Sequence, residues 1–355
     1  MQSIFNIINI PLGYVMSFLS DLFGGNFAAA VFMFTLFINL VLIPLSIKSQ
    51  KSSVQQTRIK PKLDDLKKRY GDDRQKYSEA MQKLYQEEGV SMSGGCLPMI
   101  VRMILLFSIY AIILSPLTYM AKADNTKVTH VSDAISSAME DLKKSDSDRY
   151  DEFVEKIAWT KSSGRGANNQ LKLIRILRDD PNIVQEILSE KDYAKIEEDW
   201  NSIIEADQKT HVDYSFFGID LTQTPKFSFD IFHDAQKIWI MPIIAFLSQM
   251  FTSLLSMMMQ KKINPDAPNM AGMMLTMPLI SLLIGFTLPG GVAFYWACSS
   301  LIGGLVQLGV QNFYGPHKML SRERIKELTK EYDLEETQIK KLNQSKLNDQ
   351  ETTNG

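Results

Sequence analysis

The sequence predicts an all-α polytopic membrane protein with five transmembrane helices, a cytoplasmic helical hairpin and a small helical extracytoplasmic insertion. Three observations support this fold class. Hydrophobic residues make up 45% of the 355 positions, yet the mean hydropathy is −0.08, because long apolar runs alternate with charged segments. Several of the runs reach the roughly 20 residues that cross a hydrocarbon core. Basic residues flank the runs in a pattern that gives one consistent topology.

Residues 1–25 are predicted to form an amphipathic helix that lies in the membrane interface. Val15, Leu19, Leu22 and Phe23 fall on one helical face, and the polar residues of the stretch lie largely elsewhere. A sixth span is the alternative interpretation, since the stretch has marginal length for crossing a bilayer.

Five apolar segments are predicted to cross the bilayer: residues 26–48, 95–120, 237–260, 270–288 and 291–313. Lysine and arginine residues follow the first, third and fifth of them. The positive-inside rule places these ends in the cytoplasm. We therefore expect a multi-pass protein of the bacterial plasma (inner) membrane, with its N-terminus outside and its C-terminus in the cytoplasm.

Residues 49–94 are predicted to form a cytoplasmic hairpin of two antiparallel helices. Apolar residues recur at helical spacing on both sides of a break at Gly71-Asp72-Asp73, namely Ile59, Leu63 and Leu66 before it and Tyr77, Met81 and Leu84 after it. The remaining surface is charged, and its candidate contact residues are Arg58, Lys60, Lys67, Lys68 and Arg69. The hairpin is either a contact arm or a spacer between spans, and charge alone does not separate these two interpretations.

The other connections carry less information. Residues 121–236 are polar and acidic with helical periodicity, which predicts a small helical extracytoplasmic insertion. Residues 261–269 form a short cytoplasmic loop. Residues 314–355 form a charged cytoplasmic tail that starts helical and ends in polar sequence typical of disorder.

Arg102 is the charged residue within the second apolar run. An arginine in mid-membrane costs roughly 2.5–3.5 kcal/mol and normally faces a bundle interior or a watery cavity. The alternative is that its side chain snorkels to the headgroups, because the residue lies only about 10 Å from the predicted cytoplasmic edge. Asn39 of the first span lies at a similar depth, about 13 Å from the same edge.

The spans contain no acidic residue to act as a fixed counter-ion for Arg102. A positive charge in a hydrated recess suits a transient partner, such as an acidic or polar segment of another chain. The candidate residues of this groove are Arg102, Asn39, Gln307, Trp296, Gln249 and Ser300.

The sequence offers no sign of covalent catalysis. Its two cysteines, Cys96 and Cys298, have no metal-ligand spacing, and its four histidines are scattered. Phosphate-binding glycine loops and hydrolase motifs are absent. We therefore expect neither an enzyme nor a cofactor or metal.

Several ordered motifs resemble those of the YidC/Oxa/Alb family of membrane protein insertases. They are IPLGYVMSFLSDLFGGNF, FTLFINLVLIPLSIKSQKSS, PKLDDLKKRYGDD, MQKLYQEEGVSMSGGCLPM, FFGIDL and LPGGVAFYWACSSLIGGLVQ. The resemblance covers roughly residues 4–120 and 215–313. It implies a five-span core with a hydrophilic groove that faces the cytoplasm and the lipid and is closed on the outside.

The resemblance also implies that an arginine of the first span receives polar parts of the substrate. Here that position, five residues before Pro44, is Asn39. The second-span position that is usually glutamine in the family is Arg102. The charge is therefore predicted to have moved across the groove to the facing helix.

These observations predict an insertase or chaperone that moves nascent transmembrane segments and short polar tails into the bilayer. The expected partners are nascent membrane proteins and the lipid bilayer, with a ribosome and a Sec translocon as further candidates; nucleic acid enters only through the ribosome. One alternative is a small-solute transporter or channel, for which the inverted repeats and intramembrane carboxylates are missing. Another is a membrane-anchored adaptor that acts through the insertion.

Overall fold

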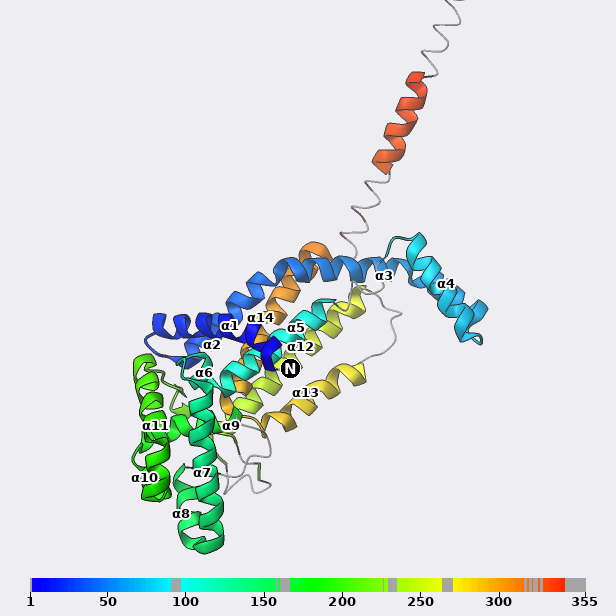
Figure 1. Ribbon diagram of the computed structural model, residues 1–355. Coiled ribbons are helices and arrows are strands. Elements are labelled where there is room, and N and C mark those ends of the chain that lie inside the picture. Colours follow the sequence, from blue (N-terminus) through cyan, green and yellow to red (C-terminus); the bar gives the residue numbers. More distant parts are fainter. Residues whose placement is uncertain are drawn as a thin grey trace, which may run out of the picture. The chain divides into compact units, whose positions relative to one another are not determined.

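The computed structural model describes residues 2–90, 97–157, 159, 167–225, 227–228, 235–263, 271–315, 318, 321, 325 and 328–341. This part of the chain is mostly helical (Figure 1). It divides into two compact units. Unit 1 contains Met1–Val41 and Ile100–Leu305, and unit 2 contains Leu42–Met99 and Val306–Gly355.

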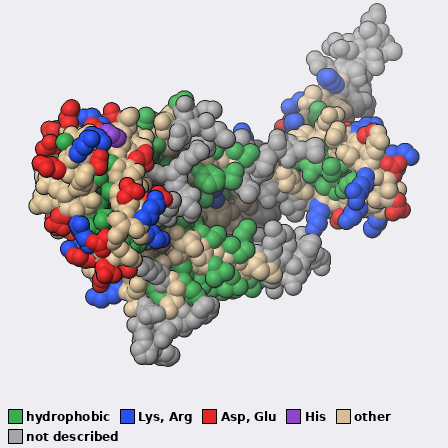
Figure 2. Space-filling view, turned by 60° about the horizontal axis from the view of Figure 1, so that its bottom comes forward, with side chains coloured by type: hydrophobic (Ala, Val, Ile, Leu, Met, Phe, Trp, Pro, Cys, Tyr) green, Lys and Arg blue, Asp and Glu red, His purple; other side chains and the backbone are tan. Residues whose placement is uncertain are grey.

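Unit 1 combines apolar helices with the polar insertion. Its apolar helices are α1 (Gln2–Leu22), α2 (Phe27–Val41), most of α5 (Leu97–Leu114), α12 (Ile240–Ile263), α13 (Ala271–Gly285) and the larger part of α14 (Gly290–Tyr314). The insertion, residues 121–236, contains α7 (Asn125–Ser145), α8 (Ser147–Ile157), α9 (Ala167–Asp179), α10 (Ile183–Ile187), α11 (Glu190–Thr210) and the strands β1 (Ser215–Phe216) and β2 (Ile219–Asp220). The short helix α6 (Pro116–Tyr119) precedes it, and the 3-10 turn η1 (Lys237–Trp239) follows it. Figure 2 shows charged side chains over the insertion and hydrophobic side chains gathered over the apolar helices.

Two described helices, Lys237–Met259 and Gly290–Tyr314, are long and apolar enough to cross a membrane. Phe27–Val41 with Ile43–Gln56 makes a third if this pair counts as one broken span. Two further apolar helices in the described part of the chain, Ile100–Leu114 and Leu275–Gly285, are shorter. These helices agree with an all-α membrane protein, and the count of five spans stays a prediction.

The break in the first apolar run occurs at Leu42. The sequence predicts one span over 26–48, but α2 ends at Val41 and α3 (Ile43–Tyr70) begins two residues later, with Pro44 in its first turn. Proline lacks the amide hydrogen of a helix interior and is tolerated in a first turn, which explains a new helix start at this point.

The exposed face of α1 is apolar and its protein-facing side is partly polar. Ile7 is 73% exposed and Phe18 64% exposed, whereas Asn9, Ser17 and Ser20 are buried. This distribution is the reverse of that on a helix surrounded by water. Val15 and Leu19 of the predicted apolar face pack against the hydrophobic core instead. The position of α1 in the membrane interface stays a prediction.

The buried residues of the insertion belong to the same hydrophobic cluster as those of the apolar helices in unit 1. Within the insertion, helices α7, α9, α10 and α11 pack around Trp200, Ile135, Val131 and Leu173, each of which is almost fully buried. The helical character of the insertion agrees with the sequence, but the two-stranded antiparallel sheet was not expected. Phe217 and Gly218 connect the strands, and both have positive φ as a tight turn requires.

Residues 211–223, which contain this sheet, bind the helix starts of unit 1. The amide of Phe27 donates to the Asp213 carbonyl at 3.0 Å. The amides of Gly290 and Gly291 donate to the carbonyls of Gln223 and Leu221, both at 2.8 Å. The first amides of a helix have no acceptor inside the helix, so this segment, named the cap segment, supplies acceptors to α2 and α14.

Arg178 on α9 anchors the cap segment to the insertion through Asp220. Its Nη2 donates to Asp220 Oδ2 at 2.9 Å, and Thr222 donates from its amide and its hydroxyl to Oδ1 at 2.9 and 2.6 Å. Burial acts to raise the pKa of Asp220, but these hydrogen bonds outweigh it, so the pKa lies below its usual value.

Unit 2 contains α3, α4 (Arg74–Glu87) and the helical residues 328–341 of the tail. Lys62 of α3 forms an ion pair with Glu88, directly after α4, which makes the two helices antiparallel. Asp73 caps α4 by accepting from the Lys76 amide at 3.1 Å. Residues 91–94 of the predicted hairpin, 264–269 of the predicted loop and 342–355 of the tail lie outside the described residues.

Replacement of Asp220 by Asn is expected to lower the apparent melting temperature of the purified protein and to weaken its dependence on pH. The loss should correspond to about 1–3 kcal/mol, because a charge-assisted bond is broken at a partly buried site. A lowered pKa means that the unfolded chain binds the proton more readily, so the stabilisation is full above the unfolded pKa and is lost as pH falls through the folded value.

Thermal unfolding at pH 7 and near pH 3 measures this effect. The difference between wild type and Asp220→Asn should shrink in acid, while Asp141→Asn on the exposed surface of α7 should behave as wild type at both values. If the melting temperatures of wild type and Asp220→Asn differ equally at both pH values, ionised Asp220 does not stabilise the fold in this way.

Candidate functional site

The helices of unit 1 have most of their buried residues at the end that carries the insertion and few at the other end; the halves with few buried residues are named the open halves. In α2 the buried residues lie between Phe27 and Thr35, whereas Phe37, Leu40 and Val41 are exposed. α5 runs in the opposite direction and shows the same gradient, since Ile109–Leu114 is mostly buried and Ile100–Phe107 contains no buried residue.

The gradient continues in the two long helices. In α14 the gradient is weaker: Val292 and Ala293 are almost fully buried and Leu301 and Leu305 are exposed, but Ile302 is still buried. In α12 the last buried residue is Ser248, and no described residue from 249 to 259 is buried. Polar side chains in these open halves are therefore accessible.

Asn39 lies in the open half of α2 and faces α14. Its side-chain amide donates to the Thr35 carbonyl at 2.8 Å. Its Oδ1 lies 3.4 Å from the place that a Cβ at Gly303 would occupy. Because Gly303 has no side chain, no Cβ atom covers the carboxamide oxygen of Asn39 at this point.

Ser300 and Trp296 share a face of α14 with Gly303, because residues three and four apart are neighbours on a helix. Ser300 is half-buried in the open half. Trp296 is half-buried and packs against the hydrophobic core. This face of α14 therefore changes from aromatic to small and polar toward the open end.

Arg102 is exposed in the open half of α5. Arg102 and Asn39 are predicted to lie at a similar depth in the membrane, and both are in the open halves of their helices. A guanidinium carries its N–H donors in a planar arrangement that matches carboxylate and phosphate groups.

Gln249 connects α12 to α13. Its Oε1 accepts from the Ser281 hydroxyl at 2.8 Å, so this predicted groove residue also holds two apolar helices together. An interhelical hydrogen bond of this kind contributes about 0.6 kcal/mol on average in a membrane.

Gln307 and the predicted contact residues belong to unit 2. The Gln307 amide donates to Gln50 Oε1 of α3 at 3.4 Å. On α3 and the hairpin, the side chains of Arg58, Lys67, Lys68 and Arg69 are exposed and that of Lys60 is half-buried. The hairpin therefore exposes basic side chains to solvent, with exposed acidic residues such as Asp64 and Asp65 between them.

Sequence reasoning missed two features of this region. Gly304 packs against α12, where an added Cβ would lie 2.5 Å from Thr252 Cγ2. The adjacent Gly303-Gly304 pair within an apolar helix was a usable signal, because small residues mark close helix contacts in membranes. The cap segment contains the motif FFGIDL, but that motif did not reveal its contacts with the helix starts, since these hydrogen bonds are accepted by main-chain carbonyls.

Comparison with known proteins identifies the family of this chain. The family model described as 60Kd inner membrane protein matches residues 18–177 and 193–317. The chain belongs to this family. Its family and its apolar helices make it a protein of the bacterial inner membrane.

Three curated proteins that are similar to this chain are named as insertases. "Membrane protein insertase YidC 2" of Listeria innocua is 37% identical over 107 residues, which cover 29% of this chain and 37% of the relative. "Membrane protein insertase YidC" of Nitratidesulfovibrio vulgaris is 40% identical over 111 residues, or 31% of this chain and 20% of the relative. The protein of the same name from Cellvibrio japonicus is 39% identical over 104 residues, or 29% and 19%. The aligned part thus spans well under half the length of these relatives, whose names describe membrane insertion and not a covalent reaction.

Replacement of Gly304 by Ala is expected to destabilise the protein, because the new methyl group would overlap the Thr252 methyl group and separate α14 from α12. Overpacking of this kind costs about 1–3 kcal/mol. Thermal unfolding of the purified protein measures the change.

Two further variants test the cause. Gly309→Ala, on the same helix but with open space around its Cβ, should not destabilise. Thr252→Ser removes the methyl group that the new side chain meets, so it should restore stability to Gly304→Ala. A double variant as unstable as Gly304→Ala would exclude this contact as the cause.

Proposed function

We propose that this chain is a membrane protein insertase that moves nascent transmembrane segments and short polar tails into the bilayer. The observation that carries the proposal is the packing gradient of unit 1, which is closed at the insertion end and open at the other. Such a bundle would receive a polar segment from one side of the membrane only. The names of the curated relatives support the same activity.

The groove would act by lowering the cost of carrying polar groups into hydrocarbon. Each unsatisfied main-chain group costs several kcal/mol there. In the proposal, Arg102 and Asn39 supply donors and hold water, and Ser300 and Gln307 extend the polar lining. Trp296 and the exposed apolar side chains of α12 and α13 would guide a hydrophobic segment sideways into lipid.

The proposed orientation places the open end and unit 2 in the cytoplasm and the insertion outside. The α3–α4 hairpin would then meet the nascent chain first. Its exposed basic residues suit a partner rich in negative charge. We propose a ribosome as that partner; a Sec translocon is a further proposed partner.

The replacement Arg102→Ala is expected to reduce the insertion of a single-span substrate with an acidic tail by about tenfold, since a charge-assisted contact contributes about 1.5–3 kcal/mol. Protease protection of the tail in proteoliposomes measures insertion. The double variant Asn39→Arg with Arg102→Ala should recover most of the activity, because it restores one positive charge to the groove, now on the facing helix α2.

The control for this experiment is Arg149→Ala on the insertion, which removes the same charge from α8. It should insert the substrate as wild type does. Full insertion by Arg102→Ala would refute the groove mechanism, and solute flux through the same vesicles would favour a transporter.

Charge reversal of Lys67, Lys68 and Arg69 to Glu is expected to weaken co-sedimentation of the purified protein with ribosomes by more than tenfold at low salt. The reason is that exposed charges act through long-range attraction, which salt screens. Lys340→Glu with Lys341→Glu on the tail is the comparison variant and should have a smaller effect. Equal binding of ribosomes by wild type and both variants would indicate that the hairpin is only a spacer between spans.

A further inference from the structure

Phe217 is the most exposed large hydrophobic side chain in the part of the chain that the structure describes. Its side chain is 91% exposed, and it lies at the tip of the β1–β2 hairpin in the cap segment. A single exposed hydrophobic residue needs no explanation by itself. Phe217, however, combines this exposure with a main-chain conformation that disfavours a large side chain.

The main chain at the hairpin tip is in the left-handed region. The φ angle of Phe217 is 49° and that of Gly218 is 74°. A two-residue turn with positive φ at both positions is of type I′, for which Asn-Gly is the preferred pair because asparagine tolerates this region. A bulky aromatic residue there is a conformational outlier. Asparagine would build the same turn with less strain and without an exposed ring, so the turn alone does not explain a phenylalanine.

Two ring contacts connect the hairpin tip to a helix that is long and apolar enough to cross the membrane. The ring of Phe217 meets that of Phe216 edge to face, with centres 4.7 Å apart. The ring of Phe216 lies 4.8 Å from that of Phe294, the fifth residue of α14. The tip therefore lies beside the start of α14.

The length of α14 indicates where the hydrocarbon begins on this side. The helix has 25 residues, none of them charged. It is about 37 Å long, whereas the hydrocarbon core is about 30 Å thick. However the excess is divided between its two ends, the boundary falls within about the first five residues of the helix. Phe294 therefore lies within about 6 Å of this boundary.

A second exposed phenylalanine lies at the same end of the other apolar helices. Phe227 is 54% exposed. Its ring lies 6.4 Å from that of Trp239, directly before α12, and 5.3 Å from that of Phe286, directly after α13. Aromatic rings thus gather at the insertion-side ends of α12, α13 and α14. Aromatic side chains concentrate where membrane proteins meet the bilayer interface.

We propose that the tip of the β1–β2 hairpin lies in the bilayer interface on the insertion side, with Phe217 as its anchoring side chain. The partner is the lipid itself, between the headgroups and the first carbons of the acyl chains. Residues 215–219 contain no charged side chain, so the contact requires no particular headgroup. Transfer of the exposed ring from water into this layer is favourable and offsets the strain of the turn. The proposal rests on α14 crossing the membrane and not on insertase activity.

Spin-label accessibility in proteoliposomes measures the position of the tip. A nitroxide is attached to Phe217→Cys in the full chain with Cys96→Ala and Cys298→Ala. Oxygen, which concentrates in lipid, and a nickel chelate, which stays in water, then compete to relax the label. We expect the ratio of the two accessibilities to lie between those of two reference labels. These are Lys191→Cys, at an exposed position of α11, and Leu247→Cys, at an exposed position within α12.

Two results of this measurement would overturn the proposal. The same ratio at positions 217 and 191 would place the tip in water. An immobilised label that neither reagent reaches would place it against protein instead of lipid.

Phe217→Trp gives an independent measurement that needs no label. Its additional emission, obtained by difference from wild type in the same vesicles, should be quenched by phosphatidylcholine that is brominated near the headgroup end of its chains. Emission that this lipid leaves unchanged would contradict contact with the interface.

Phe217→Asn separates anchoring from a local structural role. Because asparagine suits the turn, the variant in detergent should unfold at or above the temperature of wild type. A lower unfolding temperature would show that the hairpin needs the aromatic ring to fold, which would remove the reason for assigning the ring to lipid.

Discussion

The first main-chain amides of α2 and α14 need hydrogen-bond acceptors that their own helices cannot supply. The packing of unit 1 depends on which groups supply these acceptors. The carbonyls of Asp213, Leu221 and Gln223 fill that role. At a membrane boundary, an unsatisfied amide is costly because little water is available to replace the missing partner. The same contacts bring the two helix starts together, and the side chains behind them can then pack densely. Phe27 lies against Tyr214 with ring centres 4.9 Å apart, and Phe216 against Phe294 at 4.8 Å.

Dense packing at one end leaves the other end to be held by weaker contacts. There the helices meet through small residues and single hydrogen bonds, such as Gly304 against Thr252 and Ser281 with Gln249. Contacts of this kind are individually worth little in a membrane. Separation of the open halves would therefore break fewer packing contacts than separation of the closed end. This difference would suit the proposed insertase, which would admit a guest segment and then release it.

The sequence was sufficient for the features that depend on periodicity and composition. The apolar helices, the helical insertion and the antiparallel α3–α4 hairpin follow from the spacing of hydrophobic residues, and the described structure contains them. Sequence reasoning was less successful with helix ends. Pro44 already signalled a helix start, but the apolar run around it concealed the break at Leu42.

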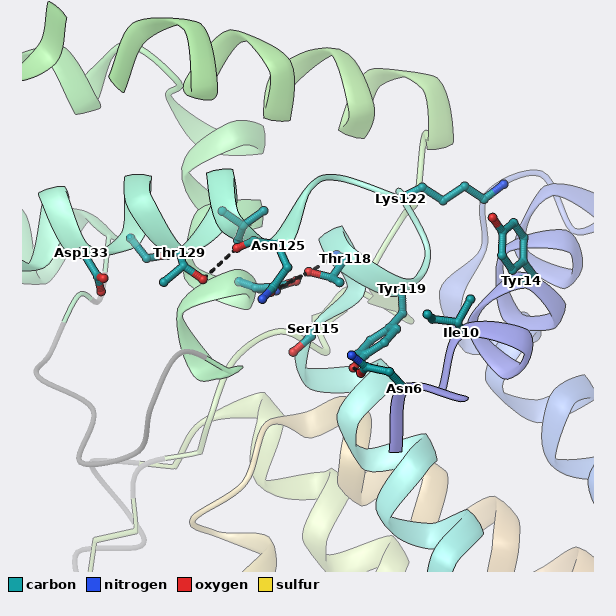
Figure 3. A pocket seen from close by; sticks show the side chains of 13 residues that line it. Asn6, Ile10, Tyr14, Ser115, Thr118, Tyr119, Lys122, Asn125, Thr129 and Asp133 are labelled. Carbon is teal, nitrogen blue, oxygen red and sulfur yellow. Dashed lines mark hydrogen bonds between the residues drawn. The ribbon is translucent and has the colours of Figure 1, made fainter. Parts of the chain in front are cut away.

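The placement of Asn39 and Arg102 at comparable depth came from counting residues along two helices. Both do lie in the open halves, although their role in a groove stays a proposal. The hydrogen bonds of the cap segment to α2 and α14 could not have been predicted in this way, because main-chain carbonyls accept them. A cavity of about 680 Å³ lies between α1, α6 and α7 (Figure 3). It could not have been predicted either, because it is lined by residues from 6 to 170 and their meeting depends on the close approach of α1 to Tyr119 that Gly13 permits.

The cap segment also determines how the insertion can be removed in experiments. A deletion of residues 121–214 would seem to separate the insertion from the membrane helices, yet it would also remove Asp213 and Tyr214 from the start of α2. A truncated protein of that design would lose activity whatever the helices α7–α11 do. A shorter excision that ends before His211, with a linker between its ends, would keep the carbonyls of Asp213, Leu221 and Gln223 at the starts of α2 and α14, although it would remove Arg178. Loss of activity in that protein would then come from the missing domain or from its anchor to the cap segment, and no longer from missing acceptors at the helix starts.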